Sequence, residues 1–574
     1  MSGSTTALTD GADAPAKAAG TVLLTLAAGQ FLMTLDSSVM NVSIATVAKD
    51  VGTTVTGIQT AITAYTLVMA TLMITGGKIG QIIGRKRALA IGCVIYGCGS
   101  FTTAIAPSLT VLLIGWSFLE GVGAALIMPA IVALVASNFG RSERPRAYGL
   151  VASAGAIAVA AGPLIGGLFT TYASWRYVFA GEVLVVIVIL AMTRRMADTP
   201  AEPGVKLDLM GTLLSAIGLG LIVFGVLRSG TWGLISPKQD APTLAGLSIV
   251  IWLIIGGLCV VRLFLTWERH RLARGQAALI DPAMLKISQL RGGLTAFLFQ
   301  YLLQAGLFLA VPLFLSVALG LSAIATGVRL LPLSITLLLA AVGIPKLWPN
   351  ASPRFVVRCG FLALFAGIVV MILALDAGAG AEIVTWPMLL AGLGVSALAS
   401  QLGSVTVGAV PDEQSGEVGG LQNTFTNLGA SIGTAVAGAV LISALTASFL
   451  TGLDNSAQVE DELAKQASVE LAAGVPFVSD KDLEQALEQA GVPPDEAAPI
   501  VEQYSKSRID GLRASLGVLA LFALLALFFG GRIPRIQPAV AQREADEAAA
   551  GSGTERDAPG GAEAAAAAVR PPEG

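Results

Sequence analysis

Three acidic residues lie in apolar stretches where a charge is costly. Asp36 is the only charged residue between positions 18 and 48, and Glu120 and Glu182 lie in two later apolar runs. A carboxyl group at membrane depth costs at least about 2.5 kcal/mol, so such residues usually face a cavity and serve an ion pathway. Together they predict a carrier that binds protons or cations.

The composition is that of a multi-pass membrane protein. The chain has 574 residues, of which 54% are hydrophobic and 13% charged, compared with about 25% charged in soluble domains. A net charge of -3 argues against nucleic acid as a partner. The four cysteines lack metal-ligand spacing, and we find no Walker loop, dinucleotide fingerprint or catalytic set. We therefore expect no cofactor, no metal and no enzyme activity.

The apolar runs predict an all-α integral membrane protein, because a bilayer core requires about 20 apolar residues per helix. Basic residues follow the even-numbered spans, which places both termini in the cytoplasm. Fourteen spans are predicted: 21–45, 56–76, 88–107, 109–137, 147–170, 177–194, 208–227, 243–266, 290–316, 323–345, 355–376, 385–409, 419–446 and 514–530.

A weak internal repeat divides these spans into two halves. Three pairs of glycines, each 271 positions apart, align the fifth span with the thirteenth: Gly149 with Gly420, Gly162 with Gly433, and Gly167 with Gly438. Parallel repeats of this kind occur in one class of secondary transporter. We therefore predict six-helix bundles at 21–196 and 290–530, with a two-helix insertion at 205–268 and a cytoplasmic loop at 269–289.

The remaining segments lie outside the bundles. Residues 447–511 are acidic and helix-forming, and the orientation makes them an extracytoplasmic helical loop. A solvated helical hairpin without a ligand is the preferred interpretation of this loop, and a ligand-binding cap is the alternative. The composition of residues 1–20 and 531–574 predicts disordered cytoplasmic termini.

Several motifs resemble the major facilitator superfamily, and within it the fourteen-helix drug:proton antiporters. They are Leu35-Asp36-Ser37-Ser38-Val39-Met40-Asn41 in the first span, Gly77 to Arg87 after the second, Gly155 to Gly167 in the fifth, Ser174 to Phe179 before the sixth, and Gly416 to Asn423 before the thirteenth. The resemblance covers nearly the whole chain. It implies the major facilitator fold, in which Asp36 is the membrane-embedded acid.

Two of these motifs have a physical interpretation. Gly155, Gly162, Gly166 and Gly167 allow close helix packing and Pro163 permits a kink, so we expect a tight interface between the halves. In the loop motif that follows the second span, glycines permit a tight turn and basic residues anchor the loop on the inner face of the membrane. The residues concerned are Gly77, Gly80, Gly84, Arg85, Lys86 and Arg87.

The chain also departs from the family pattern. Gln81 stands where the family has an acid in the loop motif, which predicts a weakened or replaced charge latch. Ser117 replaces a basic residue, whereas Glu120 and Glu182 replace amides. Two carboxyl groups are gained and the usual base is lost.

Helical rise places the acids at mid-membrane or in its outer half, with Asp36 about 22 Å along the first span. Desolvation and mutual repulsion both favour retention of a proton there. For Glu120 the alternative is an interhelical hydrogen bond, and for Glu182 it is exposure at the outer interface. The predicted substrate cavity contains Met33, Met40, Asn41, Ser117, Phe297, Gln300, Gln304, Asn423 and Asn427; polar contacts between helices are the alternative for the amides.

The predicted function is proton-coupled export of a lipophilic, cationic small molecule by a monomer in the lipid bilayer of the cell membrane. One alternative is proton-coupled transport of a specific metabolite, for instance export of a secondary product. Another is a membrane sensor whose 447–511 loop binds a ligand.

Overall fold

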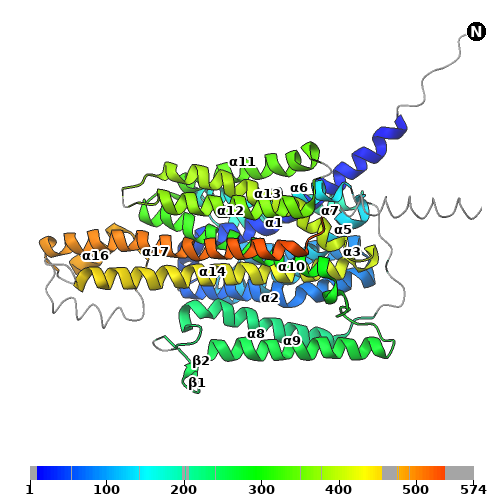
Figure 1. Cartoon of the computed structure of the whole chain (residues 1–574), viewed down its shortest axis with the longest axis horizontal. Coiled ribbons are helices and arrows are strands. Elements are labelled where there is room, and N and C mark those ends of the chain that lie inside the picture. Colours follow the sequence, from blue (N-terminus) through cyan, green and yellow to red (C-terminus); the bar gives the residue numbers. More distant parts are fainter. Residues whose placement is uncertain are drawn as a thin grey trace, which may run out of the picture.

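The computed structural model of the chain is an elongated bundle whose long helices run along one axis (Figure 1). It describes residues 10–53, 55–140, 142–196, 201, 206–238, 241–348, 351–376, 378–454, 475, 477–489 and 492–536. In this part of the chain, one two-stranded hairpin is the only sheet. The prediction of an all-helical membrane protein is confirmed.

The first half consists of six helical segments, five of which are long and apolar enough to cross a membrane. Its elements are α1 (Asp10–Asp50), α2 (Val55–Ile83), α3 (Arg85–Ala104), α4 (Leu109–Leu112), the π-helical segment η1 (Leu113–Glu120), α5 (Gly121–Asn138), α6 (Arg144–Tyr172) and α7 (Arg176–Thr193). α4, η1 and α5 run on without a break and form one span. Helix α1 begins at Asp10, before the predicted span, and residues 1–9 lie outside the described part.

The insertion is a pair of helices on one side of the bundle (Figure 1). It comprises α8 (Leu209–Trp232), β1 (Thr243–Leu244), β2 (Leu247–Ser248) and α9 (Ile249–Ala273). The prediction that a helix begins at 243 is wrong: positive φ angles at Ala245 and Gly246 make a tight turn of the kind that joins antiparallel strands. Helix α9 begins after Ser248, whose hydroxyl accepts a hydrogen bond from the Val250 amide.

The second half repeats the six-segment pattern. Its elements are η2 (Met284–Lys286), α10 (Ser288–Leu313), η3 (Phe314–Ala318), α11 (Ala323–Leu347), α12 (Pro353–Ala374), η4 (Ala381–Val384), α13 (Thr385–Val407), η5 (Asp412–Gln414), α14 (Ser415–Asp454), α16 (Asp480–Gln489), α17 (Pro494–Phe529) and η6 (Gly530–Arg532). Its apolar core runs from Ala296 to Ile533. The described residues end at 536, so the predicted disordered tail lies largely outside them.

Helices α14 and α17 extend beyond the bundle as a hairpin, which projects to the left in Figure 1. A small apolar core joins them, with Leu445, Phe449, Ile500 and Tyr504 among its members. Much of the predicted 447–511 loop is therefore a continuation of two transmembrane helices, capped by the exposed helix α16. Residues 455–474 lie outside the described part.

Thirteen helices in the described part of the chain are long and apolar enough to cross a membrane. The sequence predicts fourteen, and α3 is the difference. This helix has 20 residues, but it opens with Arg85, Lys86 and Arg87, which lowers its mean hydropathy. It nevertheless packs between α5 and α7 inside the first half, so it occupies the position predicted for a span.

The two halves use equivalent helix pairs, as the glycine repeat predicted. Helix α6 packs along α1, and α14 packs along α10. A Cβ at Gly162 would collide with Ser38 of α1, and a Cβ at Gly433 would collide with the Leu302 carbonyl of α10. Each glycine therefore permits the same close approach in its own half.

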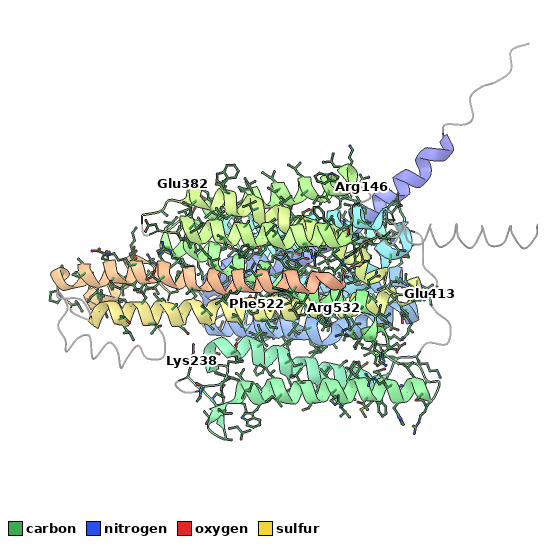
Figure 2. All side chains as sticks on the ribbon, in the orientation of Figure 1. Arg146, Lys238, Glu382, Glu413, Phe522 and Arg532 are labelled. Carbon is green, nitrogen blue, oxygen red and sulfur yellow. The ribbon has the colours of Figure 1, made fainter. Side chains whose placement is uncertain are left out.

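Charged residues mark the two ends of the bundle (Figure 2). Arg146 and Glu413 lie at the end where the chain begins, while Lys238 and Glu382 lie at the opposite end. The first end also carries the basic loops that follow even-numbered spans, so it is the cytoplasmic end.

Candidate functional site

The structure brings the three membrane acids together. Asp36 comes from α1, Glu120 ends η1, and Glu182 lies in α7; their exposed fractions are 0%, 0% and 2%. One oxygen from each carboxyl group lies within 4.8 Å of the others. Glu182, for which the sequence left open a solvated position, is fully enclosed. We call Asp36, Glu120 and Glu182 the acid cluster.

Each carboxyl group is held through one oxygen. Trp116 Nε1 donates to Asp36 Oδ1 at 2.7 Å, Thr103 Oγ1 donates to Glu120 Oε1 at 3.1 Å, and Ser100 Oγ donates to Glu182 Oε2 at 3.2 Å. The second oxygen of each group is buried and has no hydrogen-bond partner among the described residues.

None of the ion pairs in the described part of the chain includes a member of the acid cluster. Like charges this close in an apolar environment cannot all be ionised without compensation. The arrangement therefore favours shared protons, and its free oxygens are the atoms that would carry them. The cluster contains no nitrogen or sulfur donor of the kind that transition metals prefer.

Local backbone geometry sets the position of Glu120. The residues from Leu113 to Glu120 form a π-helix, a rare widening that often accompanies functional sites. Gly99 of α3 faces this segment so closely that a Cβ there would lie 2.6 Å from Glu120 Cγ. Helical spacing counted from an ordinary α-helix cannot anticipate this shift.

Tyr65 and Tyr96 are buried tyrosines of the first half, and Tyr65 connects the acid cluster to the central cavity. Tyr65 of α2 stacks on Trp116, with ring centroids 5.2 Å apart and planes 6° from parallel. Tyr96 of α3 is fully buried, and its hydroxyl group has no hydrogen-bond partner among the described residues. Because Tyr65 also lines the central cavity, the stacked pair Tyr65–Trp116 is a direct physical link between that cavity and Asp36.

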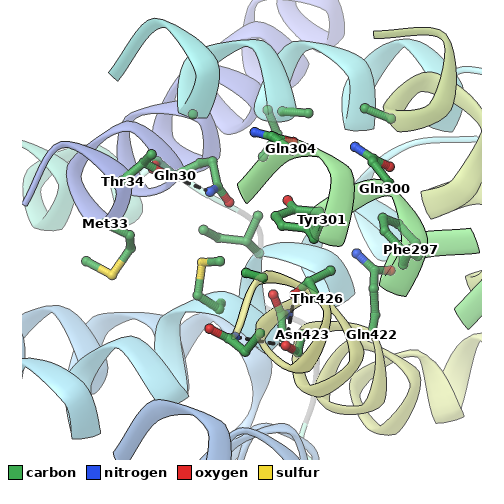
Figure 3. Close-up of a pocket in the computed structure, with 18 of the residues that line it drawn as sticks. Gln30, Met33, Thr34, Phe297, Gln300, Tyr301, Gln304, Gln422, Asn423 and Thr426 are labelled. Carbon is green, nitrogen blue, oxygen red and sulfur yellow. Dashed lines mark hydrogen bonds between the residues drawn. The ribbon is translucent and has the colours of Figure 1, made fainter. Parts of the chain in front are cut away.

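The central cavity lies between the halves and has a volume of about 340 Å³. Figure 3 shows polar side chains of α1, α10 and α14 around it. Its wall is a mixture of flexible thioethers, aromatic rings and uncharged amides. The lining includes Gln30, Met33, Thr34, Tyr65, Met69, Met73, Met128, Tyr148, Phe297, Gln300, Tyr301, Gln304, Phe308, Gln422, Asn423 and Asn427.

The structure places six of the predicted cavity side chains in this wall: Met33, Phe297, Gln300, Gln304, Asn423 and Asn427. Two others lie elsewhere. Met40 is fully buried in an apolar core with Val47 and Trp116, and Ser117 is buried and donates to the Ala61 carbonyl at 2.8 Å. The side chain of Asn41 lies outside the described residues.

Sequence reasoning missed much of the wall. Tyr65, Met69 and Met73 follow one face of α2 at spacings of four residues, and this regular spacing is the signal that could have found them. Tyr301 and Gln422 adjoin residues that were predicted. Which face of a helix points inward depends on the packing of the other half, and helical spacing alone does not give that packing.

The glycines of the fifth span form an interface within the first half, which corrects the prediction of an interface between halves. Gly155 and Gly162 lie against α1, and a Cβ at Gly166 would lie 3.3 Å from Val39 Cα. Gly167 is also buried, and the side chain of Pro163 lies outside the described residues. Contact with the second half comes nearer the start of α6, where Gly149 faces Ala341 of α11.

The loop motif joins the halves at their cytoplasmic ends. Lys78 Nζ donates to Glu417 Oε1 at 2.8 Å, and both side chains are 8% exposed. Gln81 Nε2 and Arg85 NH2 donate to the Glu413 carbonyl at 3.0 and 3.3 Å. Where the family has an acid at position 81, this chain has a Lys78–Glu417 latch that joins the two halves at this end.

The glycines of the loop motif act differently from the prediction. Gly77 and Gly80 lie inside helix α2, where Gly77 allows the Gly416 backbone to approach closely. Gly84 alone makes the turn, with a φ of 96°. Lys86 Nζ donates to the Met196 carbonyl at 2.6 Å, and Arg87 is exposed.

Comparison with known proteins identifies the class. The model of the Major Facilitator Superfamily matches residues 26–434, so the chain belongs to this family of membrane transporters. The chain is 28% identical over 459 residues to a probable actinorhodin transporter of Streptomyces coelicolor, covering 78% of this chain and 75% of that protein. It is 29% identical over 437 residues to the puromycin resistance protein pur8 of Streptomyces alboniger, with coverage of 75% and 82%.

A further relative matches over more of the length. The tetracenomycin C resistance and export protein of Streptomyces glaucescens is 26% identical over 513 residues, which cover 88% of this chain and 89% of the relative.

Among solved structures, the human organic anion transporter MFSD10 superposes with a TM-score of 0.54 at 13% identity, covering 90% of this chain and 99% of that chain. The proton:xylose symporter XylE gives a TM-score of 0.53 at 12% identity, with coverage of 92% and 99%. These similarities confirm the major facilitator fold and a multi-pass membrane location.

Proposed function

We propose that the chain exports lipophilic, cationic small molecules in exchange for protons, without altering them chemically, and acts as a monomer. One observation carries this proposal: a buried acid cluster without a basic partner among the described residues lies beside a central cavity and is linked to it through Tyr65. Alternating access of the two halves around such a midplane site is the mechanism of this architecture.

The cavity wall supports the substrate class. Its methionines adapt to ligands of different shape, and the faces of Tyr65, Tyr148, Tyr301 and Phe297 attract cations. No Lys, Arg, Asp or Glu is among the described residues that line the cavity. A permanently charged polar substrate would therefore find no counter-charge in contact, whereas a lipophilic cation would use aromatic faces and the nearby acid cluster.

Coupling follows from competition for the acid cluster. An external proton reaching Asp36 neutralises the negative charge that attracts a cationic substrate, so the substrate leaves outward. The loaded carrier reopens inward and releases the proton. A membrane potential of 100 mV contributes about 2.3 kcal/mol for each charge that crosses, which favours inward proton movement in an electrogenic exchange.

The names of the relatives support export and suggest a second candidate within it. Relatives described as a probable actinorhodin transporter and as a tetracenomycin C resistance and export protein point to export of one specific secondary product. The cavity would then have a single preferred ligand, and the coupling mechanism would be unchanged.

Reconstituted protein distinguishes these possibilities. In proteoliposomes with an imposed proton gradient, wild type is expected to accumulate several lipophilic cations and to release protons when they bind. Asp36→Asn and Glu120→Gln are each expected to lower gradient-driven transport at least about a hundredfold, the lower end of the usual scale for loss of a proton-transfer group. The control is Glu502→Gln, an exposed acid of the external hairpin. Full gradient-driven transport by both variants would refute the proposal. Transport of a single compound from the panel, with no response to the others, would favour the second candidate.

A further inference from the structure

We propose that a basic crevice between α3 and α7 at the cytoplasmic face binds the headgroup of an anionic phospholipid. The crevice has a volume of about 410 Å³ and is lined by Lys86, Arg87, Ala90, Val94, Leu190, Thr193 and Arg194. It lies on the outside of the first half and shares no lining residue with the central cavity in the described part of the chain.

The position of the crevice matches the headgroup layer. Helix α3 begins at Arg85 and α7 ends at Thr193, so both meet the membrane surface here on the cytoplasmic side. Three of the seven lining residues are basic, and the described residues that line the crevice include no acidic one. Basic pockets between transmembrane helices on this side suit anionic headgroups.

The basic side chains come from both walls of the crevice, so their positive charges converge on one point where an anion can bind. Lys86 Nζ donates to the carbonyls of Met196 and Arg194, which fixes the ammonium group at the end of α7. Arg194 is exposed and comes from the opposite wall. A phosphate placed between the walls would meet cationic groups from both helices, a planar guanidinium fork among them.

The apolar wall selects a lipid over a soluble phosphate. Val94 lines the crevice and is 51% exposed, and one turn away Ile91 is 46% exposed. On α7, Ile187 continues this surface at 55% exposed. In a membrane these side chains face acyl chains, so the crevice offers charge at the headgroup and an apolar track immediately beneath it.

Thermal stability of the purified full-length protein in detergent tests this site. Phosphatidylglycerol is expected to raise the Tm of wild type relative to phosphatidylcholine. At about 1 kcal/mol for each basic residue near an anionic surface, Arg194→Gln should weaken apparent phosphatidylglycerol binding about fivefold. Lys86→Gln combined with Arg194→Gln should weaken it about thirtyfold.

The matched control removes equal charge from the same face outside the crevice. Arg146→Gln and Arg269→Gln, both at exposed positions, should leave phosphatidylglycerol binding unchanged. Because Arg194 is exposed, its single variant is expected to fold even if the double variant does not. Equal stabilisation by soluble glycerol phosphate, equal loss in the control, or undiminished binding in Arg194→Gln would each overturn the proposal.

Discussion

At the scale of single residues, the acid cluster shows how a few neutral donors hold buried carboxyl groups. Trp116, Thr103 and Ser100 each bond to one oxygen of one acid, and none of them carries a positive charge. A basic partner would fix the acids in the ionised form, whereas neutral donors allow both ionised and protonated forms. The loss of the family's basic residue at Ser117 is therefore consistent with a cluster that exchanges protons.

Gly99 is the residue on which the position of Glu120 most depends. In Gly99→Ala the new methyl group would lie 2.6 Å from Glu120 Cγ and 2.7 Å from the Gly115 carbonyl. Overpacking of this kind costs about 1 to 3 kcal/mol of stability and would displace Glu120 from the acid cluster. We expect a lower Tm together with weakened substrate-induced proton release.

The control for this prediction is another glycine in the same half. Gly181 of α7 has open space where a methyl group would be added, with no neighbouring atom within 4 Å, so Gly181→Ala should be neutral or stabilising by about 0.5 to 1 kcal/mol. If Gly99→Ala behaves like Gly181→Ala in both Tm and proton release, the close packing of α3 on η1 is unimportant to the acid cluster.

Asp36, Glu120 and Glu182 could be singled out from the sequence because burial of a charge is costly wherever it occurs. Their meeting point could not, since it requires three helices to converge. Met40 illustrates the limit: it shares a helical face with Met33 and Asp36 in the sequence, yet it packs into an apolar core against α2 and η1. Helical spacing identifies a face, but neighbouring helices decide what covers that face.

At the scale of elements, the Lys78–Glu417 latch joins α2 to α14 at the cytoplasmic end, and we expect it to open when the cavity faces the cytoplasm. Removing one member of a buried ion pair costs about 3 to 5 kcal/mol. Because the pair exists only when the cytoplasmic ends touch, Lys78→Met and Glu417→Gln should each shift the population toward the inward-open form by about a hundredfold or more.

Cysteine labelling measures this shift. In a background without the exposed native cysteines Cys98, Cys259 and Cys359, Ala399→Cys places a thiol in the cavity wall. An impermeant maleimide applied from the cytoplasmic side should label it faster in both latch variants. The charge-swapped pair Lys78→Glu with Glu417→Lys should restore slow labelling. Unchanged labelling in both single variants would show that the latch does not hold the cytoplasmic side closed.

Element boundaries were predictable where hydropathy changes sharply, as at the basic loops after α2 and α5. They were not predictable where an apolar stretch contains a turn. Residues 243–248 have the composition of a span but form a hairpin, because Ala245 and Gly246 adopt positive φ angles. The π-helical η1 was invisible for a similar reason: its sequence is compatible with an ordinary helix, and only the close contact of Gly99 with Gly115 and Glu120 shows the difference.

At the scale of the whole molecule, the repeat provides two bundles with the same internal packing and different chemistry. The first half contains the acid cluster, whereas the second contributes Phe297, Gln300, Gln304 and the α14 amides to the shared cavity. The glycine register predicted the duplication because close helix contacts demand glycine in both halves. The placement of the acids in one half and of the cavity amides in the other was only partly predictable from the sequence. Amide side chains in a membrane helix can line a cavity or can form hydrogen bonds between helices, and the sequence does not distinguish the two roles.

The external hairpin of α14 and α17 provides the last test, because it separates a carrier from a sensor. Its arms are in contact, with Gly452 packed against the Gln503 side chain, so a flexible linker of about eight Gly and Ser residues can span them in place of residues 455–493. This change removes Asp480, whose carboxylate lies 2.8 Å from the Arg508 guanidinium. Because the segment that covers Arg508 is removed at the same time, we expect the guanidinium to be solvated by water and not to remain as an unpaired buried charge. We expect proton-driven transport within about twofold of wild type, the scale of surface changes away from the site. Loss of transport in a variant that keeps its Tm and its substrate binding would mean that the hairpin takes part in the transport cycle, and the two-bundle mechanism would then be incomplete.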